Sequence, residues 1–390
     1  MTDRLSLALV CGLALFPVTM AVPTASAQTF KTLYSYTGGA DGGGPWGTPL
    51  LNEGILYQTA FYGGSPAANN AGTIFEFFTS TNDGTTLYDF AGQPNDGSAP
   101  MGGLITDGFG DFFGTTSQGG FNLRGTVYEV SGGYEFPLYS FTGPDGETPE
   151  GSLTIDAYGD LYGTTSNGGA NASGTVFALS GGSTFVKLYS FGNYKNDGIG
   201  PASSLVLLKG VLYGVTTEGG QYGQGTVFGI NPKTKTETIL YNFRGGSNGG
   251  TPVGGLVSDG KGNLYGTASA GGSANGTAGN GVVFTINFKS LQYTLLHTFT
   301  GPDGSQPLAG LTTDGKGNFY GTTYAGGAKG YGTVFELNSA GVLTTLYSFT
   351  NGTDGSYPYA GVTVDSAGNI YGAATRGGQY NWGTLFEITP

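Results

Sequence analysis

Cysteine, histidine and charged residues are scarce in this sequence of 390 residues. It contains one cysteine, one histidine, and only 10% Asp, Glu, Lys and Arg together. Lys and Arg total 14 against 26 Asp and Glu, which gives a net charge of −12. A chain this acidic lacks the basic surface that nucleic acid or anionic lipid requires. We therefore expect neither as a partner.

Long hydrophobic runs are also missing, apart from Leu5–Val22 near the N-terminus. The run is interrupted by Gly12 and Pro17, and Ala25-Ser26-Ala27 follows it with the small-x-small pattern of signal-peptidase sites. This order is typical of a secretory signal peptide over residues 1–27, a membrane anchor being the alternative. We expect a secreted or periplasmic protein with no membrane span in the mature chain.

The only cysteine, Cys11, falls inside this predicted signal peptide. The mature chain would then have no thiol, so a disulfide and a Cys-ligated metal are not expected. No further segment looks like a separate domain, and we expect residues 28–390 to form a single one.

What the sequence has in abundance is glycine, 77 residues, and aromatic residues, 13%. The glycine is periodic, because a Gly-Gly pair follows a YGTT-like segment seven times. These pairs begin at Gly63, Gly119, Gly168, Gly219, Gly271, Gly326 and Gly377. A period of about 50 residues indicates a repeat architecture with seven units.

Each unit contains four short β-prone segments. One copy reads Gly254–Asp259, Asn263–Thr267, Gly281–Ile286 and Tyr293–Phe299, separated by turn sequences such as Asp-Gly-Lys-Gly and Gly-Pro-Asp-Gly. No window shows an apolar period of 3.6 residues, so helices are not expected. The pattern predicts an all-β, seven-bladed β-propeller with four antiparallel strands per blade.

The two ends of the mature chain complement each other. It begins with an LYSF-type strand, Leu33–Tyr36, and ends with a GTVF-type strand, Gly383–Ile388. The last unit lacks its fourth strand, which the N-terminal segment can supply. This predicts a 3+1 closure of the ring, whereas an open solenoid would leave unpaired strand edges at both ends.

Aromatic residues repeat with the same period in the LYSF, YGTT and GTVF segments. Residues fixed at the repeat period are most simply explained as packing between neighbouring blades. His297 replaces the Tyr of an LYSF segment, so we interpret it as a packed strand residue. With one histidine, neither a Ser-His-Asp or Cys-His site nor a two-histidine metal site is expected.

The repeat resembles the GloVer tandem-repeat family of exported bacterial proteins. The resemblance rests on Gly310-Leu311, Asp314–Thr323, Gly326-Gly327, Gly332–Leu337 and Leu346–Phe349, and it covers nearly all of the mature chain. Units one and four depart from it, with Asn52-Glu53-Gly54 and Lys209-Gly210 in place of the longer hairpin turn. The resemblance implies export and a propeller-like array with a variable C-terminal anchor, and it implies no activity. We see no C-terminal sorting tail.

Loops on one face of such a propeller carry a recurring Asp-Gly. The aspartates are Asp41, Asp96, Asp145, Asp197, Asp303 and Asp354. A ring of carboxylates could bind calcium or sugar hydroxyls. We favour turn chemistry, in which the side chain accepts hydrogen bonds from nearby backbone amides, and expect no cofactor, calcium remaining the open alternative.

Residues that break the repeat are better candidates for a binding site. Trp46 and Trp382 lie in loops of the first and last units, which ring closure would make neighbours. The full candidate set on this face is Trp46, Phe121, Arg124, Tyr222, Tyr331, Arg376, Tyr380 and Trp382. Flat rings with a few polar partners suit a sugar or a protein surface. The alternative is that these rings only cover the glycine-rich loops.

We therefore expect an exported, monomeric, non-enzymatic propeller that binds an extracellular glycan or protein through one loop face. The alternative from another class is a glycan-cleaving hydrolase or lyase that uses loop carboxylates, for which Glu147, Glu150 and Glu218 are available. A third reading is a calcium-dependent structural repeat protein.

Overall fold

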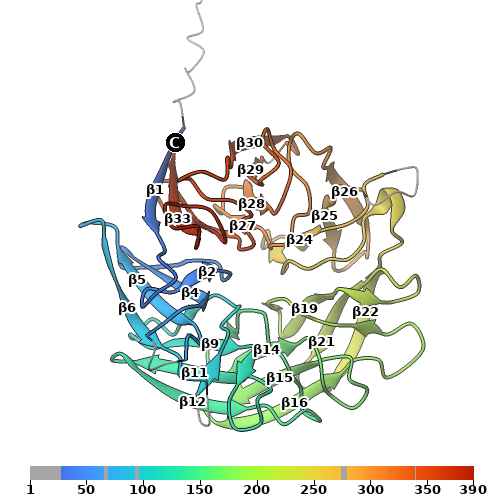
Figure 1. Cartoon of the computed structure of the whole chain (residues 1–390). Helices are drawn as coiled ribbons and strands as arrows, with labels where there is room; N and C mark the ends of the chain where they lie inside the picture. Colours follow the sequence, from blue (N-terminus) through green and yellow to red (C-terminus); the bar gives the residue numbers. More distant parts are fainter. Residues whose placement is uncertain (1–27, 66–68, 93–95, 274–278, 339) are drawn as a thin grey trace, which may run out of the picture.

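The computed structural model describes residues 28–390 except 66–68, 93–95, 274–278 and 339, so the predicted signal peptide lies outside the described residues. Seven four-stranded antiparallel sheets stand in a ring, which confirms the predicted seven-bladed β-propeller (Figure 1). We number the blades in chain order. Among the described residues, no helix is long and apolar enough to cross a membrane.

Each blade runs from the innermost to the outermost strand as follows. Blade 1 has β3 (Leu50–Asn52), β4 (Ile55–Tyr62), β5 (Thr73–Phe78) and β6 (Asp83–Asp89), with β2 (Gly43–Pro45) also paired to β4. Blade 2 has β8 (Ile105–Thr106), β9 (Phe112–Thr116), β11 (Thr126–Ser131) and β12 (Tyr134–Ser140). Blade 3 has β13 (Thr154–Ile155), β14 (Leu161–Thr165), β15 (Thr175–Ser180) and β16 (Thr184–Ser190). Blade 4 has β18 (Val206–Leu208), β19 (Val211–Thr216), β21 (Thr226–Asn231) and β22 (Thr236–Asn242).

The remaining blades repeat this order. Blade 5 has β23 (Val257–Ser258), β24 (Asn263–Ala268), β25 (Val282–Asn287) and β26 (Tyr293–Thr298). Blade 6 has β27 (Thr312–Thr313), β28 (Phe319–Thr323), β29 (Thr333–Leu337) and β30 (Leu343–Ser348). Blade 7 has β31 (Val362–Val364), β32 (Ile370–Ala374), β33 (Thr384–Thr389) and β1 (Thr29–Ser35). Among the described loop residues lie two short ribbons, β7 (Gly97–Ser98) with β10 (Gln118–Gly119) and β17 (Gly198–Ile199) with β20 (Glu218–Gly219), and the 3-10 turn η2 (Gly246–Asn248).

The N-terminal strand closes the ring as predicted. Strand β1 pairs antiparallel with β33, from Thr29 opposite Thr389 to Ser35 opposite Thr384, and Figure 1 shows the two strands side by side. Tyr36 continues the contact by donating its N–H to the Gly383 carbonyl at 3.0 Å. Blade 7 is therefore built from segments at opposite ends of the sequence.

The outermost strand of every blade carries a β-bulge. The register of its pairing shifts by one residue, and the extra residue is the leucine of the LYSF segment. These residues are Leu33, Leu87, Leu138, Leu188, Leu240, Leu296 and Leu346. A bulge increases the twist of an edge strand, which discourages edge-to-edge pairing with another molecule.

Aromatic rings fill the space between blades, as the periodicity predicts. The GTVF aromatic residue is at most 1% exposed in every blade, and the last aromatic residue of LYSF at most 2%. The two sets stack edge to face, as Phe141 does on Phe177 with ring centroids 5.2 Å apart. The first aromatic residue of LYSF is only half-buried in most blades. Burial of the GTVF aromatic residues and of the last LYSF aromatic residues supplies the main apolar stabilisation between blades.

A glycine–proline contact joins each blade to the next. The glycine immediately before the third strand of each blade has a positive φ, and a β-carbon there would lie 2.5–2.7 Å from the Cδ of a proline in the following blade. Gly383 and Pro45 make this contact across the closure. Any other residue at these glycines would have both a strained backbone and a clash, so the glycines fix the distance between neighbouring blades.

Candidate functional site

A pocket of about 730 Å³ opens at the seam where the last blade meets the first. We call it the aromatic pocket. It is lined by Gly44, Trp46, Tyr62, Leu308, Tyr324, Tyr359, Thr375, Arg376, Tyr380, Asn381 and Trp382. Six of these residues are aromatic. Four of the eight predicted site residues meet here, namely Trp46, Arg376, Tyr380 and Trp382.

Trp382 lies against glycine backbone of the N-terminal segment. A β-carbon on Gly38 would overlap the Cε2 and Nε1 atoms of the indole, and one on Gly43 would lie 2.8 Å from Cε3. The Trp382 carbonyl accepts a hydrogen bond of 2.8 Å from the N–H of Gly44. Trp382 nevertheless keeps 42% of its surface exposed, and Tyr380 beside it keeps 50%. These two rings are available to a ligand.

Trp46 was predicted to present its ring to a ligand, but in the structure other aromatic side chains cover much of that ring. Its indole stacks on Phe61 and on Tyr359, with ring centroids 4.8 and 4.6 Å apart and interplanar angles of 25° in both cases. Much of its ring surface is therefore covered by the protein's own side chains. Trp46 lines the pocket and holds Tyr359 in place, and it offers a ligand less surface than Trp382 does.

A series of ring contacts links the two tryptophans and continues into blade 6. Tyr62 meets Trp382 edge to face at 6.3 Å and Phe61 at 4.6 Å. On the other side, Tyr359 contacts Tyr324 at 6.4 Å, and Tyr357 lies between Tyr324 and the predicted Tyr331. Tyr331 thus contacts the pocket-lining Tyr324 only through the ring of Tyr357, and it does not line the pocket. Such contacts fix the orientation of the rings at little entropic cost on binding.

The described arginines differ in how far they are already engaged. Arg124 forms an ion pair with Glu147, and the Arg244 guanidinium lies 5.2 Å over the ring of Tyr222. Within the part of the chain that the structure describes, Arg376 is in no ion pair, and it is exposed in the aromatic pocket. A guanidinium offers five hydrogen-bond donors, so Arg376 can bind hydroxyl or carboxylate oxygens of a ligand.

Three predicted site residues lie elsewhere on the ring. Phe121 and Arg124 belong to the loop before β11 in blade 2, and Tyr222 belongs to the loop before β21 in blade 4. Phe121 is 77% exposed and Tyr222 is 43% exposed. None of the three lines the aromatic pocket, so they do not form one continuous site with the tryptophans.

A smaller cavity of about 100 Å³ lies on the propeller axis, beside the aromatic pocket. All seven blades contribute to it through the residue that follows a proline and precedes the innermost strand: Trp46, Met101, Glu150, Ala202, Val253, Leu308 and Tyr359. Trp46, Leu308 and Tyr359 line both spaces. Glu150 is the one ionisable acid among the described residues that line either.

Glu150 lies within hydrogen-bond distance of the Ser166 hydroxyl, which has a second acceptor nearby. The Ser166 Oγ lies 3.1 Å from Oε1 of Glu150 and 3.0 Å from the Thr148 carbonyl oxygen, and its single proton serves one of them. In the neighbouring blades the equivalent hydroxyls of Ser117 and Thr217 donate to the corresponding carbonyls. Burial raises the pKa of the Glu150 carboxyl, and the Ser166 hydrogen bond offsets part of that rise. A protonated Glu150 could donate to the Ser166 Oγ while the Ser166 hydroxyl donates to the Thr148 carbonyl.

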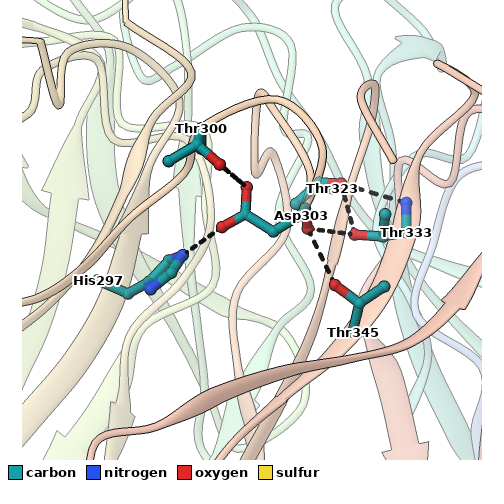
Figure 2. A network of polar contacts seen from close by, with 6 residues as sticks. All are labelled: His297, Thr300, Asp303, Thr323, Thr333 and Thr345. Atoms are coloured by element: carbon teal, nitrogen blue, oxygen red, sulfur yellow. Dashed lines mark hydrogen bonds and ion pairs between the residues drawn. The ribbon is translucent and has the colours of Figure 1, made fainter. Parts of the chain in front are cut away.

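The recurring Asp-Gly aspartates accept hydrogen bonds within their own turns. Asp303 is the example in Figure 2: its carboxylate accepts from the Thr300 N–H at 2.8 Å and the Thr300 hydroxyl at 2.9 Å, and lies 2.8 Å from Nε2 of His297. Burial acts to raise the pKa of Asp303, but these hydrogen bonds outweigh it and lower the pKa below its ordinary value. This is the turn chemistry that we favoured.

The same network ties the turn to the following blade. The Asp303 carbonyl accepts from the hydroxyl of Thr333, which is hydrogen-bonded to Thr323 at 2.8 Å (Figure 2). In five other units a tyrosine hydroxyl takes the place of His297, as Tyr88 does toward Asp96 at 3.0 Å. His297 packs edge to face on Phe299, 5.0 Å between centroids. Over the described residues, no three His, Cys, Asp or Glu side chains are grouped to hold a metal ion.

Two half-buried glutamates, Glu135 and Glu237, lie between blades on the outer side of the ring. Glu135 lies near Asp96, and Glu237 accepts a hydrogen bond of 2.5 Å from the Tyr194 hydroxyl and lies 3.3 Å from the Tyr189 hydroxyl. In both, Oε1 is buried without a hydrogen-bond partner. Burial, with repulsion from Asp96, raises the pKa of Glu135 to about 8, and burial raises that of Glu237 to about 7.

Sequence reasoning missed Tyr62, Tyr324 and Tyr359, which complete the aromatic pocket. Tyr359 could have been found, because it occupies the position after the recurring proline that is variable from unit to unit. Tyr62 and Tyr324 follow YGTT-like segments, where the other units have small or polar residues. The signal was present as a departure from the repeat.

Comparison with known proteins identifies the fold and the family. Among solved structures, the chain is similar to the GH74 enzyme of Niastella koreensis (13% identity, TM-score 0.57, covering 88% of this chain and 52% of that one) and to the GH74 xyloglucanase of Xanthomonas campestris (10%, 0.56, 92% and 55%). It is also similar to an oligogalacturonate lyase of Vibrio parahaemolyticus (10%, 0.55, 93% and 97%). The chain spans about half the length of the two GH74 structures. At these identities the likeness shows the propeller fold alone.

No curated protein matches the chain. A family model does, in three overlapping segments that cover residues 19–205, 110–278 and 273–390, which is nearly the whole sequence. This agrees with the resemblance carried by the GGL, YGTT and GTVF segments. The chain belongs to the family described as the Gloeobacter/Verrucomicrobia repeat.

Proposed function

We propose that this protein is an exported, monomeric propeller that binds a carbohydrate in the aromatic pocket without cleaving it. The observation that carries the proposal is the pocket itself, in which the exposed rings of Trp382 and Tyr380 lie beside Arg376 and Asn381. A sugar ring has apolar C–H faces that stack on aromatic rings, and its hydroxyls pair with amide and guanidinium groups.

The shape of the pocket favours a carbohydrate over a protein partner. Its volume of about 730 Å³ lies in the range of small-molecule sites, about 300–1,000 Å³. A stable protein interface needs about 800 Å² of contact on each partner and is usually flat. A concave site with six aromatic residues supports binding of a ring-shaped ligand.

The protein contains only two tryptophans, and both line this pocket. Intrinsic fluorescence therefore reports directly on the site. We expect a glycan that binds to change this emission saturably, and Trp382→Ala to weaken its binding about 10-fold, which corresponds to about 1.4 kcal/mol. Tyr158→Ala is the matched control, because Tyr158 is 91% exposed in a blade 3 turn outside the pocket. Equal affinity in both variants, measured by calorimetry, would reject the pocket as the binding site.

Glycan cleavage is the second candidate, and the observation that favours it is Glu150. A carboxyl with a raised pKa beside a sugar-sized pocket has the property required of a general acid. Cleavage by two acids needs a second carboxylate 5–10 Å away, as an order of magnitude. Of the other predicted candidates, Glu147 is paired with Arg124 and Glu218 is an exposed residue of β20. Neither lines the pocket or the axial cavity.

A reducing-end assay on a panel of polysaccharides separates the two candidates. We expect no release of reducing ends by the wild-type protein under conditions where it binds. Release that is lost in Glu150→Gln but retained in Glu218→Gln would establish cleavage instead. Export is tested separately, by sequencing the N-terminus of the protein recovered outside the cytoplasm, where we expect the first residue to be Gln28.

A further inference from the structure

A second pocket lies beside the aromatic pocket, between blades 1 and 2. It has a volume of about 560 Å³ and is lined by loops that follow β4, β6 and β9. The side chains that matter here are Phe61, Tyr62, Asn70, Gln118 and Leu123. We call it the amide pocket.

The two pockets meet at one residue. Tyr62 lines both, and it is 47% exposed. Its neighbour Phe61 lines the amide pocket and stacks on Trp46, which lines the aromatic pocket. Tyr62 therefore lies between two adjoining spaces, and a ligand that occupied both would cross its side chain.

The lining of the amide pocket selects a type of ligand. Among the described residues that line it there is no Asp, Glu, Lys, Arg or His. Asn70 and Gln118 are exposed, and each amide offers both donors and an acceptor. Leu123, 55% exposed, adds an apolar surface. Hydroxyl groups, which donate and accept, match such a lining, whereas a charged ligand would find no counter-charge.

We propose that the ligand is an extended oligosaccharide that crosses Tyr62, with some sugar units in the aromatic pocket and further, uncharged units in the amide pocket. This rests on the proposed function, which requires only the aromatic pocket. A chain that fills both pockets gains the contacts of the second without a second loss of translational and rotational freedom. Affinity should therefore rise with chain length and then level off once both pockets are filled.

The test measures affinity by calorimetry for cello-, xylo-, malto- and chito-oligosaccharides, each as a disaccharide and as a hexasaccharide. We expect the hexasaccharide of the preferred series to bind at least 10-fold more tightly than its disaccharide. Asn70→Ala with Gln118→Ala should remove most of that gain and leave the disaccharide affinity unchanged. Gln221→Ala, an exposed glutamine of a blade 4 loop, is the matched control and should change neither.

The outcomes separate the two levels of the proposal. If the disaccharide and hexasaccharide bind equally, or the amide variants weaken both lengths alike, the extended site is wrong and the aromatic pocket alone is the site. If no oligosaccharide of any series binds, the proposed function is wrong. Trp382→Ala should weaken both lengths, because both use the aromatic pocket.

Discussion

The indole of Trp382, in the last blade, lies where a β-carbon on Gly38, in the segment that follows β1, would have to be. Gly38 has a φ of 76°, so an alanine there would be strained as well as in collision. The orientation of the pocket's most exposed tryptophan thus depends on a residue 344 positions earlier.

Gly38→Ala should therefore displace Trp382 and weaken glycan binding about 10-fold. Part of any loss of stability would come from the backbone alone, so the control must share that strain. Gly210→Ala does, because Gly210 has the same φ of 76° and open space around its Cα. Fluorescence titration and a thermal melt of both variants compare the two effects. If both bind equally well, Gly38 does not position the indole.

Removal of residues 28–40 should lower the melting temperature and broaden the unfolding transition. Without β1, strand β33 would have an unpaired edge and the aromatic layer between blades 7 and 1 would lose Tyr34 and Tyr36. Calorimetry measures the change. A synthetic peptide of residues 28–40 added to the truncated protein should restore part of the melting temperature. A truncated protein that melts like the full chain would refute the role of the closure.

The half-buried glutamates Glu135 and Glu237 predict that the stability of the folded protein falls as the pH rises. Burial raises the pKa of Glu135 to about 8 and of Glu237 to about 7, so both favour the neutral form in the folded protein. Their contribution to stability is complete below the ordinary glutamate pKa and is lost as the pH rises through about 7 to 8. The melting temperature should drop by several degrees between pH 5 and pH 9. The double variant Glu135→Gln and Glu237→Gln should drop less, and Glu218→Gln should follow the wild type.

The His297–Asp303 pair should be replaceable by the arrangement of the other units. His297→Tyr would place a hydroxyl near Asp303, as Tyr347 does for Asp354 at 3.0 Å, and we expect a melting temperature within about 2 °C of wild type. Asp303→Ala removes the acceptor for Thr300 and His297 and should cost about 1–3 kcal/mol. Chemical denaturation measures both. A large loss in His297→Tyr would show that the histidine has a role beyond packing.

The turn aspartates give a prediction about calcium. Because Asp96 accepts from the Tyr88 hydroxyl and from backbone N–H groups of Ala91 and Gly97, its oxygens are already engaged. We expect no change in melting temperature when a chelator is added or when calcium is supplied. An ion bound to the native state alone would raise the melting temperature with its concentration. Such a rise would establish the calcium-dependent alternative.

The sequence predicted the fold well because the repeat encodes it locally. The sequence of each unit predicts its four strands and its turns, and the period of the aromatic residues indicates which strand faces are buried. The repeat pattern does not show when a substitution at one position is compensated by a substitution at another. In blade 1, Gln58 stands where six units have glycine beneath the central aromatic ring, and Gly84 provides the missing room, since a β-carbon there would lie 2.5 Å from Cζ of Phe75. Only the three-dimensional structure shows that the changes at Gln58 and Gly84 belong together.

The candidate site was predicted in part for a related reason. Ring closure brought Trp46 and Trp382 into one pocket, which followed from topology. Whether a ring is free or covered depends on side-chain packing, and Trp46 proved to be stacked on Phe61 and Tyr359. Phe121 lies in blade 2 and Tyr222 in blade 4, and neither lines the aromatic pocket. The lengths of the loops in the sequence do not show whether their side chains reach the same pocket.

The pairing of β1 with β33 also determines at which stage of folding the aromatic pocket is complete. Most blades of this propeller can assemble from consecutive sequence while the chain is still being made, but the aromatic pocket needs Gly38 and Trp382 at once. In a nascent chain the aromatic pocket is therefore incomplete until the final strand has docked, and we expect the proposed affinity for a ligand to arise only at that last step of folding.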